Sequence, residues 1–286
     1  MAAGRTELVL ILCNAVDSAD MALLPGIFRV LEMDYFVSPK QLGRMVFWQN
    51  CLKSLATIAW GFVADRRDRK QLLSRACLAW GALTLAVALC SSFTMLAALR
   101  IVSVSVLAIM MPLSQGMLSD LVSPARRGAA FGRLGFWSNI GGMLGGALST
   151  MLSSTIILGA FRGWRLAFAL VGCCSLMLVP VVERYVRDPP RAGLLGPGRG
   201  SSSSSGSGSG GLSIVAALRV IVGKPTFVLL VLQGVFGEMP WVAFSTFSTL
   251  FLQYAGLSNS EVAGLFVVRS IGGALGKKTA FLQPFI

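Results

Sequence analysis

The sequence predicts an all-α protein that crosses a membrane several times. Of its 286 residues, 55% are hydrophobic and only 13% are charged, whereas soluble domains carry about 25% charged residues. Apolar stretches long enough to span a bilayer, which needs about 20 residues, recur along the chain. The net charge of +13 comes mostly from Lys and Arg between these stretches, as is typical of cytoplasmic loops, so we expect no nucleic-acid partner.

Eight stretches have the composition of spans, and the last is short. They lie at about residues 8–31, 42–63, 72–93, 94–118, 132–158, 164–182, 226–254 and 261–276. The first is a poor signal peptide, because Glu7 interrupts its basic region and its apolar stretch continues to Phe28, so we expect an uncleaved span. Lys and Arg are densest after spans two, four and six, which predicts a cytoplasmic N-terminus and central linker.

A composition change divides the chain into parts. Residues 193–211 are rich in Gly and Ser, with Ser201–Ser205 followed by a Gly/Ser alternation, which predicts a flexible tether. The expected domains are an N-terminal six-helix transmembrane bundle at 1–187, a Gly/Ser-rich cytoplasmic linker at 188–213, and a partial C-terminal bundle of about two spans at 214–286. Residues 214–222 have the pattern of a helix on the membrane surface. Ser38 and Leu42 recur 220 residues later as Ser258 and Val262, which favours two halves with one plan.

The composition argues against an enzyme. The chain has no histidine, which removes the commonest general base and the usual metal ligand. Its six cysteines lie within apolar stretches without C-x-x-C spacing, so neither a disulfide framework nor a zinc site is indicated. The Gly/Ser segment contains a formal G-x-G-x-x-G with no strand before it, which does not indicate a dinucleotide site. We expect no enzymatic activity, no metal and no cofactor.

Polar and ionisable residues inside the spans indicate a cavity, because each ionisable one costs about 2.5–3.5 kcal/mol to insert. Asn14, Asp17 and Asp20 share one side of the first span, since successive helical residues turn by about 100°. The other candidates are Gln49, Asn50 and Lys53 in span two, Arg100 and Gln115 in span four, and Gln233 and Glu238 in span seven.

In the functional interpretation, these residues line a water-filled cavity for a substrate and protons. Lys53 and Arg100 attract an anionic group, while Asp17 or Asp20 pairs with them or carries a proton. The structural alternative is internal ion pairing, or snorkelling of Arg100 to the interface, which satisfies the charges without a function.

Span five carries glycines at the spacing that lets helices approach closely. Gly141 with Gly145 and Gly142 with Gly146 both give G-x-x-x-G. Small residues at this spacing form helix contacts in membranes. We expect them to pack within one chain rather than to form a dimer face, and they also allow the helix to bend.

The loop after span two carries the most specific local pattern. Gly61 stands at the membrane edge, Asp65 follows four residues later, and Arg66, Arg69 and Lys70 come next. General positive charge on a cytoplasmic loop does not account for the glycine or the acid. Asp65 beside several arginines predicts a gating latch that forms in one conformation and breaks in the other.

This loop resembles the G-x-x-x-D-R-x-x-R-K signature of the major facilitator superfamily. Further similarities are Arg100 in span four, the glycines of span five, Arg127-Gly128, the segment from Gly163 to Phe168, and Asn14-x-x-Asp17, which is similar to the Spinster-like branch. The resemblance implies two six-helix bundles with a substrate cavity between them that opens alternately to each side. It also implies transport of a small organic solute, driven by its own gradient or by protons; the residues favour an anionic solute and the branch favours a lipid-like one.

Two departures from the family pattern lead to expectations of their own. Asp68 stands where the family usually has glycine, so we expect an altered loop turn. The resemblance ends near Gly276, before a second signature loop, so we expect a C-terminally truncated transporter embedded in the lipid bilayer. The alternative is a truncated membrane protein that does not transport and instead associates with, or interferes with, a full-length copy.

Overall fold

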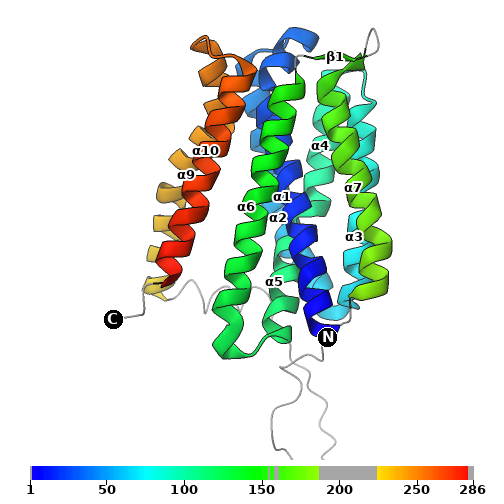
Figure 1. Ribbon diagram of the computed structural model, residues 1–286, viewed down its shortest axis with the longest axis vertical. Coiled ribbons are helices and arrows are strands. Elements are labelled where there is room, and N and C mark those ends of the chain that lie inside the picture. Colours follow the sequence, from blue (N-terminus) through cyan, green and yellow to red (C-terminus); the bar gives the residue numbers. More distant parts are fainter. Residues whose placement is uncertain (1, 154, 158–160, 187–223, 283–286) are drawn as a thin grey trace, which may run out of the picture. The chain divides into compact units, whose positions relative to one another are not determined.

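The computed structural model describes residues 2–153, 155–157, 161–186 and 224–282 (Figure 1). Contacts divide the chain into two compact units, Met1–Pro190 with Leu250–Ile286, and Arg191–Thr249. The expected linker at 188–213 and the surface helix at 214–222 lie outside the described residues, and the division at 187 and 213 stays a prediction.

The all-α expectation is confirmed, and the expected spans correspond to long helices. The elements are α1 Ala2–Tyr35, α2 Pro39–Arg66, α3 Arg69–Ala88, α4 Phe93–Leu107, α5 Met110–Leu121, α6 Pro124–Ser153, β1 Ile156–Ile157, β2 Phe161–Arg162, α7 Gly163–Tyr185, α9 Pro225–Tyr254 and α10 Asn259–Leu282. The short strands β1 and β2 pair antiparallel between α6 and α7. The expected fourth span is two helices, α4 and α5, separated by a turn at Ala108 and Ile109.

Five segments of the described helices are long and apolar enough to cross a membrane. They are Gly4–Tyr35, Arg69–Ala88, Phe93–Leu121, Gly163–Tyr185 and Pro225–Tyr254. Helices α2, α6 and α10 are at least as long as the shortest of these but contain more polar or glycine residues, which lowers their mean hydropathy.

The six N-terminal spans pack into one bundle around α1. Helix α1 contacts α6 and α7, α3 contacts α7 and α4, and α2 contacts α4 (Figure 1). Large side chains fill the centre: Phe28, Trp80, Trp164 and Phe168 are fully buried. Successive spans run in opposite directions, so α1, α3 and α6 all begin at one end of the bundle.

The glycines of α6 face two different helices. A Cβ atom added at Gly141 would lie 2.6 Å from the carbonyl carbon of Ala15, and one at Gly145 would lie 2.6 Å from the Cα atom of Ala19, both in α1. A Cβ at Gly146 would instead meet the ring of Phe266 in α10, at 2.6 Å from Cε1. A Cβ at Gly142 would lie 3.6 Å from the backbone oxygen of Ser18, also in α1. Three of these glycines therefore face α1, and Gly146 alone of the four faces α10.

Helices α2 and α10 begin in the same way. The backbone N–H of Ser38 donates to Gln41 Oε1 at 2.8 Å, and the backbone N–H of Ser258 donates to Glu261 Oε2 at 2.8 Å. In each case the side chain three residues after the cap satisfies a backbone donor that the first turn leaves open. These are the positions that repeat at an offset of 220 residues in the sequence.

Candidate functional site

A fully buried ion pair lies at the centre of the N-terminal bundle. Arg100 Nη1 of α4 donates to Asp20 Oδ2 of α1 at 2.7 Å, and neither side chain is exposed. Thr84 Oγ1 of α3 donates to the other carboxylate oxygen at 3.3 Å, and the Phe168 ring lies 5.4 Å from the guanidinium carbon. Arg100 therefore does not snorkel to the interface; its charge is neutralised internally by Asp20.

Asp17 lies one helical turn before Asp20, and its carboxylate is less fully hydrogen-bonded than that of Asp20. Its Oδ1 atom is buried and has no hydrogen-bond partner among the described residues. Lys53 and Arg100 are near enough for their positive charges to act on the Asp17 carboxylate. Asp17, Asp20, Lys53 and Arg100 thus form one group of four charges, which we call the charge cluster.

Lys53 is the less constrained cation of this cluster. It comes from the middle of α2 and is half-buried. Its Nζ atom lies 3.9 Å from Met21 Sδ of α1, a weak acceptor. Of the two cations, Arg100 is held by the buried ion pair with Asp20, whereas the described contact of Lys53 Nζ is a weak one.

The other polar candidates are placed in different surroundings. Asn14 is buried and donates to the backbone oxygen of Leu10 at 2.8 Å. Gln49 is buried, and its Oε1 atom has no partner in the described part of the chain, whereas Asn50 is exposed and Gln115 is half-buried. Gln233 and Glu238 lie on α9 within the other unit, so their part in the cavity stays a prediction.

The signature loop connects α2 to α3 through a helix cap. Asp68 accepts hydrogen bonds from the backbone N–H groups of Lys70 at 2.9 Å and Gln71 at 3.2 Å. Its φ of −64° is open to any residue, so the turn does not need the glycine that is usual in the family. Asp68 caps α3 with its side chain and does not need the backbone flexibility of a glycine.

Arg69 of the same loop makes an ion pair that the sequence analysis missed. Its Nη1 atom lies 2.7 Å from Asp120 Oδ2 near the end of α5. Nothing lies within 4 Å of a Cβ added at Gly61, and the side chains of Asp65 and Arg66 lie outside the described residues. The latch assigned to Asp65 stays a prediction, and Arg69 with Asp120 is an interhelical ion pair of this loop that the structure describes.

At the other end of the bundle, β2 and the first turn of α7 contact α1 and the end of α3. Trp164 Nε1 donates to Asp34 Oδ2 at 3.1 Å, and Arg162 pairs with Asp34 Oδ1 at 2.9 Å. Arg165 Nη1 donates to the backbone oxygen of Ala88 at 3.1 Å. The sequence pointed to Gly163–Phe168 only by resemblance, and Asp34 gave no local signal.

A family model confirms what the signature loop indicated. The model of the Major Facilitator Superfamily matches residues 10–285. The chain belongs to the Major Facilitator Superfamily. No curated protein matches the chain significantly.

Solved structures of superfamily transporters have the same fold. A bacterial homologue of the human lysosomal transporter Spinster, inward-facing and unoccupied, gives a TM-score of 0.72 at 23% identity, covering 100% of this chain and 64% of that one. The same kind of protein in its occupied form gives 0.71 at 23% identity, over 94% of this chain and 59% of that one. The D-xylose-proton symporter gives 0.69 at 14% identity, over 96% and 67%.

Membership of the superfamily makes this chain an integral multi-pass membrane protein with a transporter fold, and it argues against an enzyme. The chain spans less than two thirds of the length of the two Spinster homologue structures. These likenesses show the fold alone.

Proposed function

We propose that this chain takes part in secondary active transport of a small organic solute by alternating access, with the proton as coupling ion. The charge cluster carries the proposal: two carboxylates and two cations lie together inside a membrane-embedded bundle, and one carboxylate oxygen, Asp17 Oδ1, has no partner in the described residues. Ionisable groups kept at such a cost mark substrate or proton pathways.

The cluster provides a way to couple a proton to an anion. With both carboxylates ionised, its four charges sum to zero. When Asp17 takes up a proton, the cluster carries one net positive charge, and Lys53, the cation outside the buried ion pair, meets an anionic group. Proton and anion then favour each other's binding by the same free energy. An anionic or lipid-like solute fits this arrangement, and the likeness to a proton symporter supports the choice of ion.

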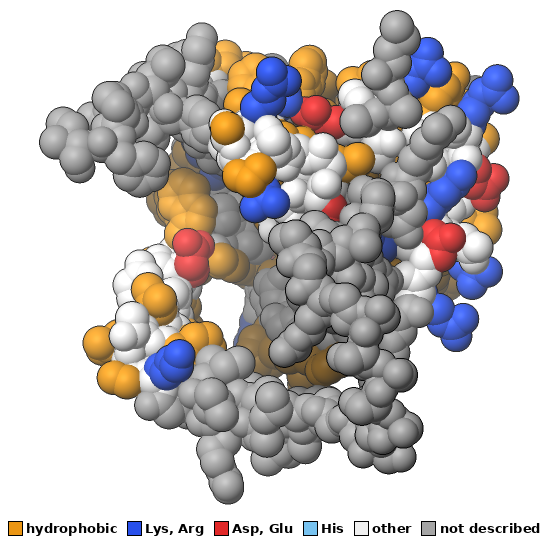
Figure 2. Space-filling model, turned by 90° about the horizontal axis from the view of Figure 1, so that it is seen from below, with side chains coloured by type: hydrophobic (Ala, Val, Ile, Leu, Met, Phe, Trp, Pro, Cys, Tyr) orange, Lys and Arg blue, Asp and Glu red, His pale blue; other side chains and the backbone are white. Residues whose placement is uncertain are grey.

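We also propose the orientation and the division of the chain. Figure 2 looks onto the end where α1 begins and shows mainly Lys and Arg among its charged side chains. Exposed residues at this end include Arg67, Arg75, Arg126, Arg127 and Arg133. Such a bias supports a cytoplasmic N-terminus, with a bundle at 1–187, a cytoplasmic linker at 188–213 and a partial second bundle at 214–286.

Flux in proteoliposomes tests the proposed coupling. The chain is reconstituted with an imposed proton gradient and offered two probes, a fluorescent lysophosphatidic acid and D-xylose, while an internal dye reports pH. We expect the gradient to drive movement of the anionic amphiphile in preference to the sugar. Asp17→Asn should abolish the dependence on the gradient, because the variant cannot exchange the proton.

Glu183→Gln is the matched control, since Glu183 lies outside the cluster and accepts from Ser74 Oγ at 2.8 Å. Unchanged flux and an unchanged pH profile in Asp17→Asn would rule out Asp17 as the proton carrier. Absence of solute-dependent flux from the unaltered chain would rule out autonomous transport and favour the non-transporting alternative. Co-purification with a differently tagged full-length copy then tests that alternative.

A further inference from the structure

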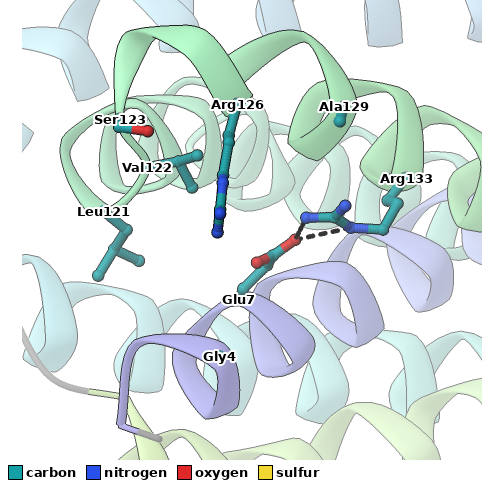
Figure 3. A pocket seen from close by; sticks show the side chains of 8 residues that line it. All are labelled: Gly4, Glu7, Leu121, Val122, Ser123, Arg126, Ala129 and Arg133. Carbon is teal, nitrogen blue, oxygen red and sulfur yellow. Dashed lines mark hydrogen bonds and ion pairs between the residues drawn. The ribbon is translucent and has the colours of Figure 1, made fainter.

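A charged cavity lies at the end of the bundle where α1 begins. It has a volume of about 550 Å³ and is lined by Glu7 of α1, by Leu121 and Val122 at the end of α5, and by Arg126 and Arg133 of α6 (Figure 3). Pockets that bind small ligands measure about 300–1,000 Å³. Glu7 precedes Asp17 by ten residues, which is about 15 Å along a helix, so this cavity is separate from the charge cluster.

The charges of this cavity are not balanced. Arg133 donates to Glu7 Oε1 through both Nε and Nη2, which engages one carboxylate oxygen and one edge of the guanidinium. Arg126 extends from the first turn of α6 into the space between α6 and α1 (Figure 3). The described residues give the Arg126 guanidinium no hydrogen-bond partner. Two positive charges therefore face one negative charge.

The cavity also stands at the level where lipid headgroups lie. Its lining includes Gly4 and Leu121, which are terminal residues of the apolar segments Gly4–Tyr35 and Phe93–Leu121. Leu121 and Val122 are half-buried and add an apolar wall beside the arginines. A ligand that suits this cavity has an anionic head next to less polar atoms.

We propose that this cavity binds a phosphate group, with Arg126 as its main anchor and Arg133 as a second donor. The planar guanidinium of arginine donates two parallel hydrogen bonds to phosphate oxygens. The phosphate belongs either to the headgroup of an anionic phospholipid or to a soluble phosphate. Glu7 opposes binding, since it repels the phosphate and holds Arg133.

Three variants separate these roles. Arg126→Gln removes the anchor without disturbing a contact of the described residues and should weaken binding by about tenfold, as expected for lost hydrogen bonds to a charged group. Arg127→Gln is the matched control, because Arg127 lies outside the lining and donates to the backbone oxygen of Ser119 at 3.2 Å. Glu7→Gln should strengthen binding, because it removes the repulsion and releases Arg133.

The measurement uses the full chain in maltoside detergent. Native mass spectrometry follows binding of phosphatidylglycerol, with a phosphate-free galactolipid as comparison, and calorimetric titration follows inorganic phosphate. Binding of phosphatidylglycerol that is weakened in Arg126→Gln and unchanged in Arg127→Gln supports the proposal with a lipid as source. The same pattern for inorganic phosphate alone supports it with a soluble source. If Arg126→Gln and Arg127→Gln bind both probes equally, the proposal is wrong.

Discussion

Asp20 and Arg100 depend on each other because both are fully buried. Asp20→Leu leaves the guanidinium without its counter-charge, and breaking a buried pair in this way costs about 3–5 kcal/mol. The double variant Asp20→Leu with Arg100→Met removes both charges and should recover most of that loss. Thermal unfolding in detergent measures the two effects, and simple addition of the two single losses would contradict the coupling.

Asp68 shows how one side chain substitutes for backbone freedom. Its carboxylate caps α3 while its φ stays at −64°, so the site does not require glycine. Asp68→Ala should destabilise the protein by about 1 kcal/mol, whereas Asp68→Asn should be close to neutral and Asp68→Gly should cost only a few tenths. Hydrogen exchange at the first turn of α3 checks this order, and equal effects of Ala and Asn would show that the cap contributes nothing.

At the scale of an element, substitutions in α6 can test whether its glycines are needed for close contact with α1 or for flexibility of the helix. Gly141→Val places side-chain atoms against the backbone of Ala15, so α1 and α6 must separate, at a cost of about 1–3 kcal/mol or more. Gly135→Val is the control on the same helix, because a Cβ there meets nothing within 4 Å. Both substitutions change helix propensity equally, so a lower thermal midpoint in Gly141→Val alone isolates the contact.

The break between α4 and α5 shows a limit of prediction at this scale. Pro112 cannot donate to the carbonyl of Ala108, and its ring crowds that group, which accounts for the turn at Ala108 and Ile109. Yet Pro25, Pro180 and Pro240 lie inside continuous helices. A proline alone therefore does not tell whether a span divides, because the neighbouring helices decide whether the freed carbonyl is satisfied elsewhere.

For the whole molecule, features that depend on neighbouring residues in the sequence could be predicted, whereas contacts between residues far apart in the sequence could not. Hydropathy is local, so the spans and the all-α fold were predictable, and the signature loop identified the family. Ion pairs join residues that are far apart in the sequence. Arg100 pairs with Asp20, 80 residues away, rather than with Asp17, and Arg69 pairs with Asp120. Which carboxylate meets which cation depends on how helices rotate against each other, and the sequence pattern does not contain that rotation.

One contact between distant parts of the chain bears on alternating access. Tyr254, at the end of α9, donates to the Glu32 carboxylate, with its oxygen 2.7 Å from Oε1. Arg29 pairs with Glu32 at 3.4 Å, and its guanidinium carbon lies 4.7 Å from the centre of the Tyr254 ring. These three residues join the far end of α1 to the turn before α10, at the opposite end of α1 from Glu7.

Alternating access, as proposed for this chain, requires the contact of Tyr254 with Glu32 to break when this end of the protein opens. Tyr254→Phe removes the hydroxyl and keeps the ring beneath Arg29, so about 1 kcal/mol of a partly exposed, charge-assisted hydrogen bond is lost. Hydrogen exchange in the turn between α9 and α10 should then become about fivefold faster. Tyr185→Phe is the control, since Tyr185 lies at the other end of the bundle, on α7. Equal exchange in both variants would show that the contact does not hold this end closed.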